Sequence, residues 1–470
     1  MRTSENDIKK PKFSYKRGLS YSIGQMSDIT AYQTFTFLIF TFYYAVVGVS
    51  VILIMIGFII WALWNSFNDF LIGYLSDRTH TKWGRRYPYI MFSIIPLALV
   101  MFFLFTPLFP IGIENQIPNF VYFLIIIIIF ELFFTMYDLN YTALFPELFI
   151  TLDERTKANN LRQAFAILGL IMAFVLPGLF ITDYSDPQSF GEYQFFGIII
   201  AVIVIIPGLI FLKITPREKA EFKEDYKQAP GFFDSIKMCI KSKSFSWYIP
   251  AEIANWFVYG ILPTLVPLYA KAVLGMEDAF MVSILLGLTF ISSVIFITFL
   301  WKPIVRKLGN RKAWMISMTT WIVTLFPLMF LGPNMELIAM IVFFFIGLGL
   351  SGSLYIIDLI VSDIIDEDEV NTGIRREAGY YGVNAFFLRL AIIVVFISIG
   401  PMFIIADWEV FTLPASEGIQ LTLRILMFGY PAVALIIAIL AIYKYPLHGE
   451  RLKQVKEKLK EIHEQKKSKI

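Results

Sequence analysis

Long apolar runs, separated by short polar connections, make up most of the sequence. Several runs reach or exceed the roughly 20 residues that a helix needs to cross a bilayer, and the mean hydropathy of the chain is +0.67. We therefore expect an all-α membrane protein. The apolar runs predict 12 transmembrane helices, at residues 19–46, 51–76, 88–108, 119–147, 160–182, 192–214, 246–273, 278–302, 312–332, 337–363, 378–403 and 421–445.

The connections between these runs alternate in charge. Lys and Arg gather in one set, at residues 10–17, 78–86, 155–162, 217–243, 302–312 and 371–376 and from residue 444 onward. The other set has no Lys or Arg, as at residues 109–118, 183–191, 333–336 and 404–420. Because cytoplasmic loops hold the positive charge, we expect the first set and both termini to be cytoplasmic.

The longest polar connection divides the chain into two halves of six predicted helices. Glu147 corresponds to Asp363 and Thr156 to Thr372 at one offset, although chance similarity among polar loops is the alternative. Two parallel six-helix halves related by an axis along the membrane normal are typical of one class of transporters. We predict an N-terminal bundle at residues 1–214, a cytoplasmic loop at 215–245, a C-terminal bundle at 246–446 and a charged cytoplasmic helix or tail at 447–470.

The composition excludes several functional classes. The 470 residues are 57% hydrophobic and 16% charged, and the formal net charge of +3 gives no indication of nucleic-acid binding. The single cysteine, Cys239, excludes an intrachain disulfide and a CxxC motif. The sequence has no Walker loop, HExxH motif or recognisable catalytic triad. We therefore expect neither an enzyme nor a bound cofactor.

Residues Trp64–Pro88 place polar side chains inside an apolar run that ends in a basic loop. Asn65, Asn68 and Asp69 share one side of the predicted second helix, because residues three and four apart are neighbours on a helical surface. A carboxylate is costly in lipid, so Asp69 is by default a candidate for function. The alternative is a structural carboxylate that is paired with an arginine.

The loop GYLSDRTHTKWGRRYP resembles the signature between the second and third helices of the major facilitator superfamily. Its longer form, with DRT before KWGRR, is similar to that of the glycoside–pentoside–hexuronide:cation symporter family. The segments SYSIGQMSD, MYDLNYTALFPEL and DIIDEDEVNTGIRRE extend the resemblance along the chain. The resemblance implies the major facilitator fold and cation-coupled transport by alternating access.

The cation site of that family corresponds to Asp69, Asn65, Asn68 and Thr135 in this sequence. Asn65 stands where a sugar permease of the family has a carboxylate, so Na⁺ at Asp69 would lose one anionic ligand, although an amide oxygen can still coordinate. Burial disfavours the charged form of a lone carboxyl group, which favours proton exchange. The resemblance therefore leaves both H⁺ and Na⁺ as coupling ions.

The resemblance also implies a substrate site between the two halves. Asp28 and Asp138 correspond to a pair that binds sugar hydroxyls, since a carboxylate accepts charge-assisted hydrogen bonds. Arg162 and Arg389 correspond to basic residues of that cavity, and the alternative is that they only neutralise its carboxylates. Further candidate contacts are Tyr141, Tyr355, Trp256, Tyr259 and Asp358, because Thr142 and Leu354 stand where tryptophans are expected.

Other charged residues are predicted to lie near the cytoplasmic ends of the helices. They could form ion pairs between the halves that close this side and break when it opens; the candidates are Asp77, Arg78, Arg85, Arg86, Asp363, Arg375 and Arg376. Glu131 and Glu252 receive no role from the resemblance, and Glu252 could reach the membrane interface. Asp358 could contact substrate or pair with Arg389.

These observations favour a multi-pass transporter of the cell membrane that couples a small solute to H⁺ or Na⁺. The family resemblance implies a sugar or glycoside as the solute. A lysolipid or another amphiphile is the alternative, because the expected tryptophans are missing. A non-transporting sensor or scaffold of the same fold is a further alternative, and we expect a monomer in the lipid bilayer.

Overall fold

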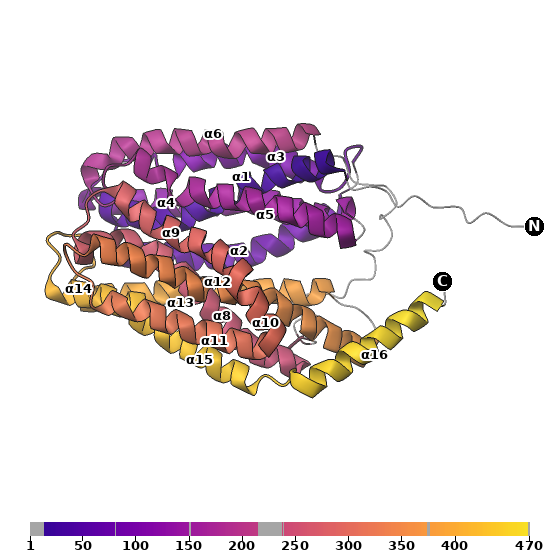
Figure 1. The fold of residues 1–470 in the computed structure, drawn as a ribbon. Coiled ribbons are helices and arrows are strands. Elements are labelled where there is room, and N and C mark those ends of the chain that lie inside the picture. Colours follow the sequence, from indigo (N-terminus) through magenta and orange to yellow (C-terminus); the bar gives the residue numbers. More distant parts are fainter. Residues whose placement is uncertain are drawn as a thin grey trace, which may run out of the picture.

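The computed structural model describes residues 14–79, 81–149, 152–214, 237, 239–373 and 377–468, which form a bundle of long helices (Figure 1). The first half contains α1 (Tyr15–Thr41), α2 (Val51–Arg78), α3 (Tyr87–Phe103), α4 (Gln116–Leu148), α5 (Leu152–Phe174) and α6 (Phe190–Ile214). The second half contains α8 (Lys243–Tyr269), α9 (Ala279–Phe296), α10 (Lys302–Leu308), α11 (Asn310–Leu325), α12 (Glu336–Thr372), α13 (Glu377–Ile405), α14 (Glu417–Arg424) and α15 (Tyr430–Lys444). A last helix, α16 (Gly449–Ser468), follows them.

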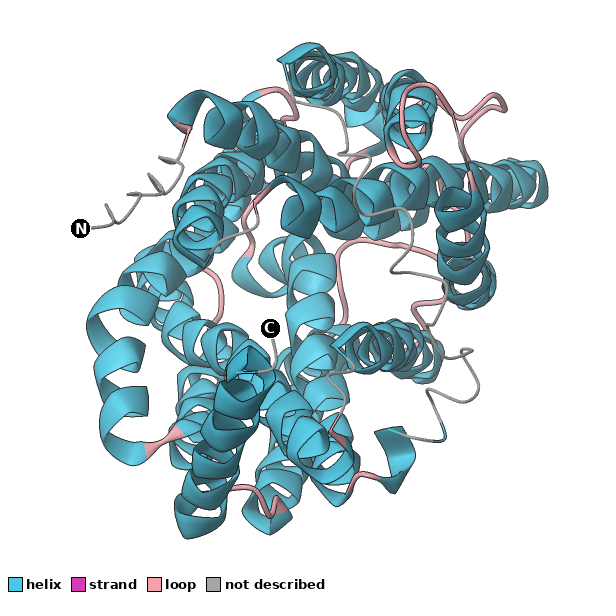
Figure 2. Ribbon diagram, turned by 90° about the vertical axis from the view of Figure 1, so that its right-hand side faces the viewer, coloured by secondary structure: helices cyan, strands magenta, loops and turns pink. Residues whose placement is uncertain are grey.

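Short segments of other helix types extend several of these helices. Four π-helical segments follow α1, α8, α9 and α14, at Phe42–Val46, Ala270–Leu274, Ile297–Trp301 and Ile425–Gly429. Four 3₁₀ segments lie at Ile113–Asn115, Leu176–Leu179, Pro187–Ser189 and Phe326–Met329. Figure 2 looks along the bundle, and many of its helices are seen nearly end-on.

Each predicted transmembrane segment coincides with one helix or with one continuous series of helices. Among the described residues, nine of these segments are long and apolar enough to cross a membrane, and α3 is a shorter apolar helix. The prediction of an all-helical membrane protein is therefore confirmed. The helices α5 and α11 complete the set, and within their own halves α5 packs against α1 and α11 against α12.

Some predicted helix boundaries are wrong at polar stretches. The fifth helix begins at Leu152 rather than at residue 160, and α12 continues to Thr372 rather than ending at residue 363. Several charged residues, such as Glu, Lys and Arg, are good helix formers, so a helix can continue past the edge of the apolar run. The predicted loop at 215–245 lies largely outside the described residues, and α8 begins at Lys243.

Several pairs of helices join the two halves in the described part of the chain. Helix α2 packs against α13, α1 against α8 and α5 against α9. In Figure 1, the helices α1 to α6 occupy the upper part of the view, and α11, α13 and α15 occupy the lower part. The surface between the halves is therefore where a solute pathway would lie in a transporter of this architecture.

The halves are fastened together at one end, which we call the closed end. The connections between helices at this end belong to the set without Lys or Arg. Lys271, at the end of a helix, is the exception. Five contacts among the described residues join the halves there: the Tyr44 hydroxyl with the Trp408 carbonyl, the Val51 amide with the Glu409 carbonyl (2.9 Å), the Ala279 amide with the Thr182 carbonyl (2.9 Å), the Tyr184 hydroxyl with the Ser283 hydroxyl (2.5 Å), and Lys271 Nζ with Asp183 (2.6 Å). The closed end is therefore opposite to the basic connections.

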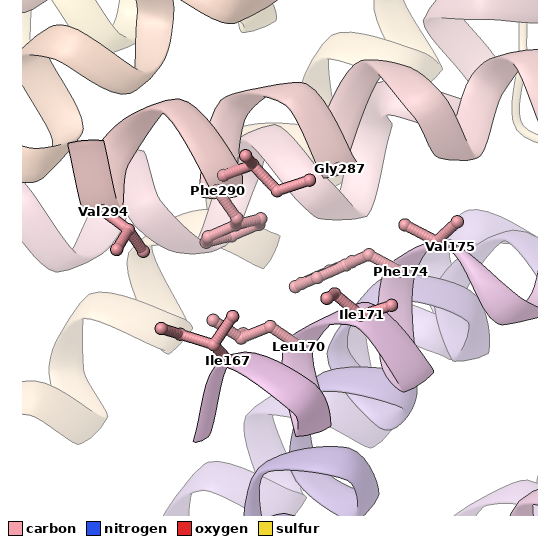
Figure 3. Close-up of a pocket in the computed structure, with 9 residues that line it drawn as sticks. Ile167, Leu170, Ile171, Phe174, Val175, Gly287, Phe290 and Val294 are labelled. Carbon is pink, nitrogen blue, oxygen red and sulfur yellow. The ribbon is translucent and has the colours of Figure 1, made fainter. Parts of the chain in front are cut away.

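An apolar hollow lies where α5 crosses α9 (Figure 3). Phe174 stacks on Phe290 at this crossing, with ring centroids 4.6 Å apart. The lining residues are Ile167, Leu170, Ile171, Phe174, Val175, Gly287, Phe290, Ile291 and Val294. Because these side chains offer only carbon atoms, the hollow is part of the packing between the halves and is not a polar binding site.

Glycines in α12 allow it to approach two neighbouring helices closely. A methyl group on Gly349 would collide with the backbone of Trp321 in α11, and one on Gly347 would collide with Ser292 in α9. On the same contact, the Thr289 hydroxyl donates to the Phe343 carbonyl (2.8 Å). Small residues and interhelical hydrogen bonds of this kind drive helix association in membranes.

Gly349→Ala should destabilise the C-terminal half by about 1–3 kcal/mol, because the added methyl group overpacks the α11–α12 contact. Thermal unfolding of the detergent-purified protein measures this as a lower Tm. The matched control is Gly382→Ala in α13, where an added methyl group meets no atom within 4 Å. Equal Tm values for the two variants would contradict the close packing of α12.

The helix α16 is attached to the end of α12 by ion pairs. Lys456 Nζ lies 2.7 Å from Asp363 and 2.6 Å from Asp366, and Arg451 lies 2.6 Å from Glu367. Burial tends to lower the pKa of Lys456, but its hydrogen bonds with the two aspartates outweigh burial and raise that pKa above 10.5. The predicted C-terminal charged segment is thus a helix that packs on the C-terminal half.

Lys456→Met should lower the stability of the α12–α16 contact by roughly 0.5–1 kcal/mol, because the ammonium group is partly screened by solvent. The matched control is Lys458→Met, an exposed lysine on the same helix. The raised pKa of Lys456 stabilises the folded state at neutral pH, and this contribution is lost only as the pH rises above 10.5 through the folded-state pKa. Hydrogen exchange of α16 measures the effect, and faster exchange in both variants would argue against a specific contact.

Candidate functional site

An ion pair between the two halves lies at the centre of the polar residues in the bundle. Asp69 on α2 accepts a hydrogen bond from Arg389 on α13, with Oδ2 and the guanidinium nitrogen 2.7 Å apart. Both side chains are largely buried, with 26% and 20% of their surfaces exposed. The packing of α2 against α13 brings these groups together.

This contact adds a partner to those expected for Arg389. The sequence placed Arg389 among the substrate residues, with Asp28, Asp138 or Asp358 as its carboxylate partner. The structure gives it a direct ion pair with Asp69, the central residue of the predicted cation site, and an electrostatic interaction with Asp138. The pairing follows from the register of α2 against α13, which the sequence alone does not provide.

Thr135 connects Asp69 to a second carboxyl group. The Thr135 hydroxyl lies 3.1 Å from Asp69 Oδ1 and 3.2 Å from Glu131 Oε1. Glu131 is one turn before Thr135 on α4 and is completely buried. The four-residue spacing on one helix face was the signal that could have included Glu131 in the predicted site.

The two asparagines of the predicted cation site are completely buried. Asn68 donates to the Glu131 carbonyl (3.1 Å), and its own side-chain oxygen has no hydrogen-bond partner among the described residues. Both polar atoms of Asn65 are likewise without such a partner in the described part of the chain. Unpaired buried polar groups are costly, so these oxygens are available to a ligand such as Na⁺, which oxygen ligands suit.

Asp28, Asp138 and Arg162 lie near one another in the first half. Asp28 is buried and accepts from Gln25 (2.7 Å), and Asp138 accepts from Thr142 (3.2 Å). Both aspartates interact electrostatically with Arg162. The structure thus brings the predicted hydroxyl-binding pair together beside one cation.

The same arginine also reaches across to the second half. Asp358 on α12 interacts electrostatically with Arg162, and its side chain is exposed although it lies within a long apolar helix. Asp358 thus interacts with Arg162, and no described contact pairs it with Arg389.

The predicted aromatic contacts differ in their accessibility. Tyr141 is completely buried, its hydroxyl donates to the Tyr21 carbonyl (3.1 Å), and the two rings stack with centroids 4.6 Å apart. Its ring therefore has no free face for a solute in this structure, which corrects its placement in the substrate set. Trp256 and Tyr355 are only partly buried, so they remain candidates for a solute contact.

Glu252 is a buried hydrogen-bond acceptor and does not reach the membrane interface, contrary to the suggestion from sequence. Only 1% of the residue is exposed. Its Oε1 accepts from the Trp256 indole nitrogen (3.0 Å) and from the Asn384 amide (3.1 Å). The partner on α13 explains the difference, because Asn384 holds the carboxyl group inside the second half.

The predicted gate residues are only partly described. The side chain of Asp77 and all of Arg375 and Arg376 lie outside the described residues. Arg78 is exposed, with its guanidinium 4.0 Å from the ring centroid of Tyr74, whereas Arg85 and Arg86 are buried.

Asp363 shows a different arrangement from the one predicted. It accepts from Asn310 (2.7 Å) and pairs with Lys456 of α16 (2.7 Å). Both partners belong to the second half, because α16 packs against the end of α12. The ion pairs described for Asp363 therefore stabilise the second half internally and do not join the halves.

The paired helical halves, with charged groups buried between them, define a membrane transporter of the major facilitator class. The sequence profile of the MFS/sugar transport protein family matches residues 20–449. The chain belongs to this family, and the resemblance to the glycoside–pentoside–hexuronide:cation symporters is confirmed. It is a multi-pass integral membrane protein.

Individual relatives are distant but extend along most of the chain. The sodium-dependent lysophosphatidylcholine symporter 1 of Mus musculus is 20% identical, over 86% of this chain and 80% of the relative. The isoprimeverose transporter of Lactiplantibacillus pentosus is 22% identical, over 81% of this chain and 78% of the relative. The solved structure of the nucleoside transporter NupG has a TM-score of 0.65 at 14% identity, covering 91% of this chain and 99% of that one, which shows the fold alone.

A double-mutant cycle tests the Asp69–Arg389 ion pair. Asp69→Asn and Arg389→Gln should each lower the free energy of unfolding by about 1–3 kcal/mol, because each leaves one largely buried charge without its partner. The double variant should regain much of that loss, since it has neither charge. Thermal unfolding of the purified protein measures all four forms, and purely additive losses would show that the two groups do not interact.

Proposed function

We propose that the protein is a cation-coupled symporter of a sugar or glycoside that works by alternating access. The observation that carries this proposal is that Asp69 and Thr135, of the predicted cation site, lie beside Asp138, a carboxylate predicted to bind the solute. Thr135 and Asp138 are three residues apart on α4, and Asp138 interacts electrostatically with Asp69. A cation that neutralises Asp69 therefore changes the field at Asp138, where the solute would bind.

Coupling follows from this proximity. If the cation increases the affinity for the solute, the solute must increase the affinity for the cation by the same factor. The ion pair between α2 and α13 adds a connection between the halves, because a cation at Asp69 would compete with Arg389. A cation bound at Asp69 would thereby alter the Asp69–Arg389 contact, on which the relative movement of the halves depends.

A sugar or glycoside suits the chemistry of the predicted substrate site. Asp28 and Asp138 supply carboxylate acceptors for hydroxyl groups, and Arg162 supplies a donor. The named function of the isoprimeverose transporter supports the same solute class. We propose that one monomer in the bilayer contains the complete pathway, since both halves contribute charged residues that interact with Arg162.

A lysolipid or another amphiphile is the second candidate. Leu354 lines a small hollow of the second half, whose other lining residues are Asn255, Trp256, Tyr259, Trp321, Leu350, Ser353 and Ile357. Leu350, Leu354 and Ile357 offer apolar contacts to an alkyl group. The sodium-dependent lysophosphatidylcholine symporter of the mouse is a relative that supports this alternative by name.

Uptake into proteoliposomes tests the proposed function. The probes are labelled isoprimeverose, lactose and lysophosphatidylcholine, each under separate H⁺ and Na⁺ gradients. We expect gradient-driven accumulation of a sugar, reduced about tenfold or more in Asp69→Asn because coupling energies of this kind are typically 1–3 kcal/mol. The matched control, Glu114→Gln, alters an exposed carboxylate at the start of the fourth transmembrane segment and should behave as wild type.

Each remaining outcome has a defined meaning. Accumulation of the lysolipid alone would replace the sugar by an amphiphile. Equal accumulation by wild type and Asp69→Asn would remove Asp69 from the coupling mechanism. No gradient-driven uptake of any probe would contradict the proposed solute classes and favour the sensor or scaffold alternative.

A further inference from the structure

A small hollow in the second half is lined by two residues whose buried polar atoms lack partners. It is the hollow that Leu354 also lines, between α8, α11 and α12, and we call it the second-half hollow. Asn255 of α8 and Trp321 of α11 line it, and only 2% and 1% of these residues are exposed. Among the described residues, neither the Asn255 side-chain oxygen nor the Trp321 indole nitrogen has a hydrogen-bond partner. Unpaired buried polar groups are costly, so a ligand that pairs both atoms would remove this cost.

The orientation of the Asn255 amide follows from its other contacts. Its nitrogen donates to the Ala251 carbonyl (2.7 Å) and lies 3.4 Å from the Met318 sulfur. A carbonyl accepts a hydrogen bond but cannot donate one, so the amide nitrogen belongs at this position and the oxygen is the atom without a partner. Asn255 thus provides the second-half hollow with a free acceptor, and Trp321 provides it with a free donor.

Two other polar groups in the lining are already engaged. The Trp256 indole nitrogen donates to Glu252 (3.0 Å). The Ser317 hydroxyl donates to the Gly349 carbonyl (2.8 Å), so its 3.3 Å contact with Ser353 uses the hydrogen of the Ser353 hydroxyl. Trp256 therefore contributes an aromatic surface to the hollow and no hydrogen-bond donor.

The lining of the second-half hollow extends to residues that meet the first half. Tyr259 belongs to the lining, and it interacts electrostatically with Tyr32 of α1. Asp358 directly follows the lining residue Ile357, and it interacts with Arg162 of α5. The hollow therefore borders residues that meet the predicted substrate site of the first half.

A hydroxyl group is the smallest chemical group that satisfies both unpaired atoms at once. It has one hydrogen to donate and an oxygen that accepts, whereas a carboxylate only accepts and an ammonium group only donates. An alkyl group would leave both Asn255 and Trp321 unpaired. The partly buried ring of Trp256 adds an apolar surface, which suits the carbon-bound hydrogens of a sugar ring.

We propose that the second-half hollow is a subsite for one hydroxyl group of the transported solute, with Asn255 as the acceptor and Trp321 as the donor. This inference rests on the proposed function and deepens it, because it gives the second half a direct part in binding a sugar. Asp28, Asp138 and Arg162 would bind other hydroxyl groups from the first half. A solute that contacts both sets of residues stabilises the arrangement of the halves in which both sets reach it.

Ultraviolet resonance Raman spectroscopy of the detergent-purified protein tests the subsite directly. The difference between the spectra of wild type and Trp321→Phe isolates the indole N–H band of Trp321, whose frequency reports hydrogen bonding. We expect lactose or isoprimeverose to shift this band, in a saturable manner, to the frequency of a hydrogen-bonded indole. The matched control is Trp314→Phe, which isolates a second buried indole of α11 that lies outside the hollow and has no described hydrogen-bond partner. The Trp314 band should not shift.

Two spectroscopic results would overturn the proposal. A Trp321 band that has the hydrogen-bonded frequency before any sugar is added, and keeps it afterwards, would mean that water alone fills the hollow. A Trp321 band that keeps the frequency of an unpaired indole with both sugars would mean that no hydroxyl group enters.

Affinities for deoxy sugars identify the hydroxyl group. Trp321→Phe and Asn255→Leu should each weaken sugar binding about two- to tenfold, the range for one hydrogen bond between neutral groups. The monodeoxy analogue that lacks the bound hydroxyl should lose a similar factor in wild type. Trp321→Phe should bind this analogue and the parent sugar equally well.

Two affinity results would contradict the subsite. If every analogue loses the same factor in wild type and in Trp321→Phe, the indole and the missing hydroxyl do not interact. Weaker binding of lysophosphatidylcholine in Leu354→Ala, with unchanged binding in Trp321→Phe, would assign the hollow to an alkyl chain.

Uptake into proteoliposomes separates this inference from the proposed function. Gradient-driven accumulation of a sugar without a shift of the Trp321 band would contradict the subsite and leave symport standing. A saturable shift of the band without gradient-driven accumulation would support the subsite and contradict the coupling to a cation.

Discussion

The ion pair between Asp69 and Arg389 is the interaction on which the proposed mechanism depends. It joins α2 of the first half to α13 of the second half at 2.7 Å, within the part of the bundle where other charges gather. Charges in a membrane protein are costly unless they are compensated. The pair therefore gives the two halves a preferred relative position that any change in the charge of the cluster will disturb.

The surroundings of this pair differ between its two sides. On the first-half side, Thr135 and Glu131 extend the cluster along α4, and Asp138 follows on the same helix. On the second-half side, the Arg389 Nε has no hydrogen-bond partner among the described residues. Most carboxylates of the proposed ion and solute sites thus lie in the first half, and Arg389 of the second half contacts them.

The sequence predicted the helical architecture well, because apolar runs and loop charges depend only on local composition. It also indicated Asp69, Asn68 and Thr135 as neighbours, since helix spacing and family resemblance apply to single helices. The sequence could not predict that Arg389 would reach Asp69, or that Tyr141 would pack behind Tyr21, because both depend on how helices are rotated against each other. Glu131 received no role from the sequence for a related reason, because it meets Asp69 of another helix through the Thr135 hydroxyl, which both carboxyl groups contact.

The attachment of α16 to α12 has a mechanical consequence. Because Lys456 and Arg451 bind carboxylates at the end of α12, α16 is a rigid extension of the second half and has no described ion pair with the first. A fluorophore or a fused domain at the far end of α16 will follow the rotation of that half alone. If the halves rotate against each other as proposed, the far end of α16 would be displaced farther than the end of α12 to which it is attached.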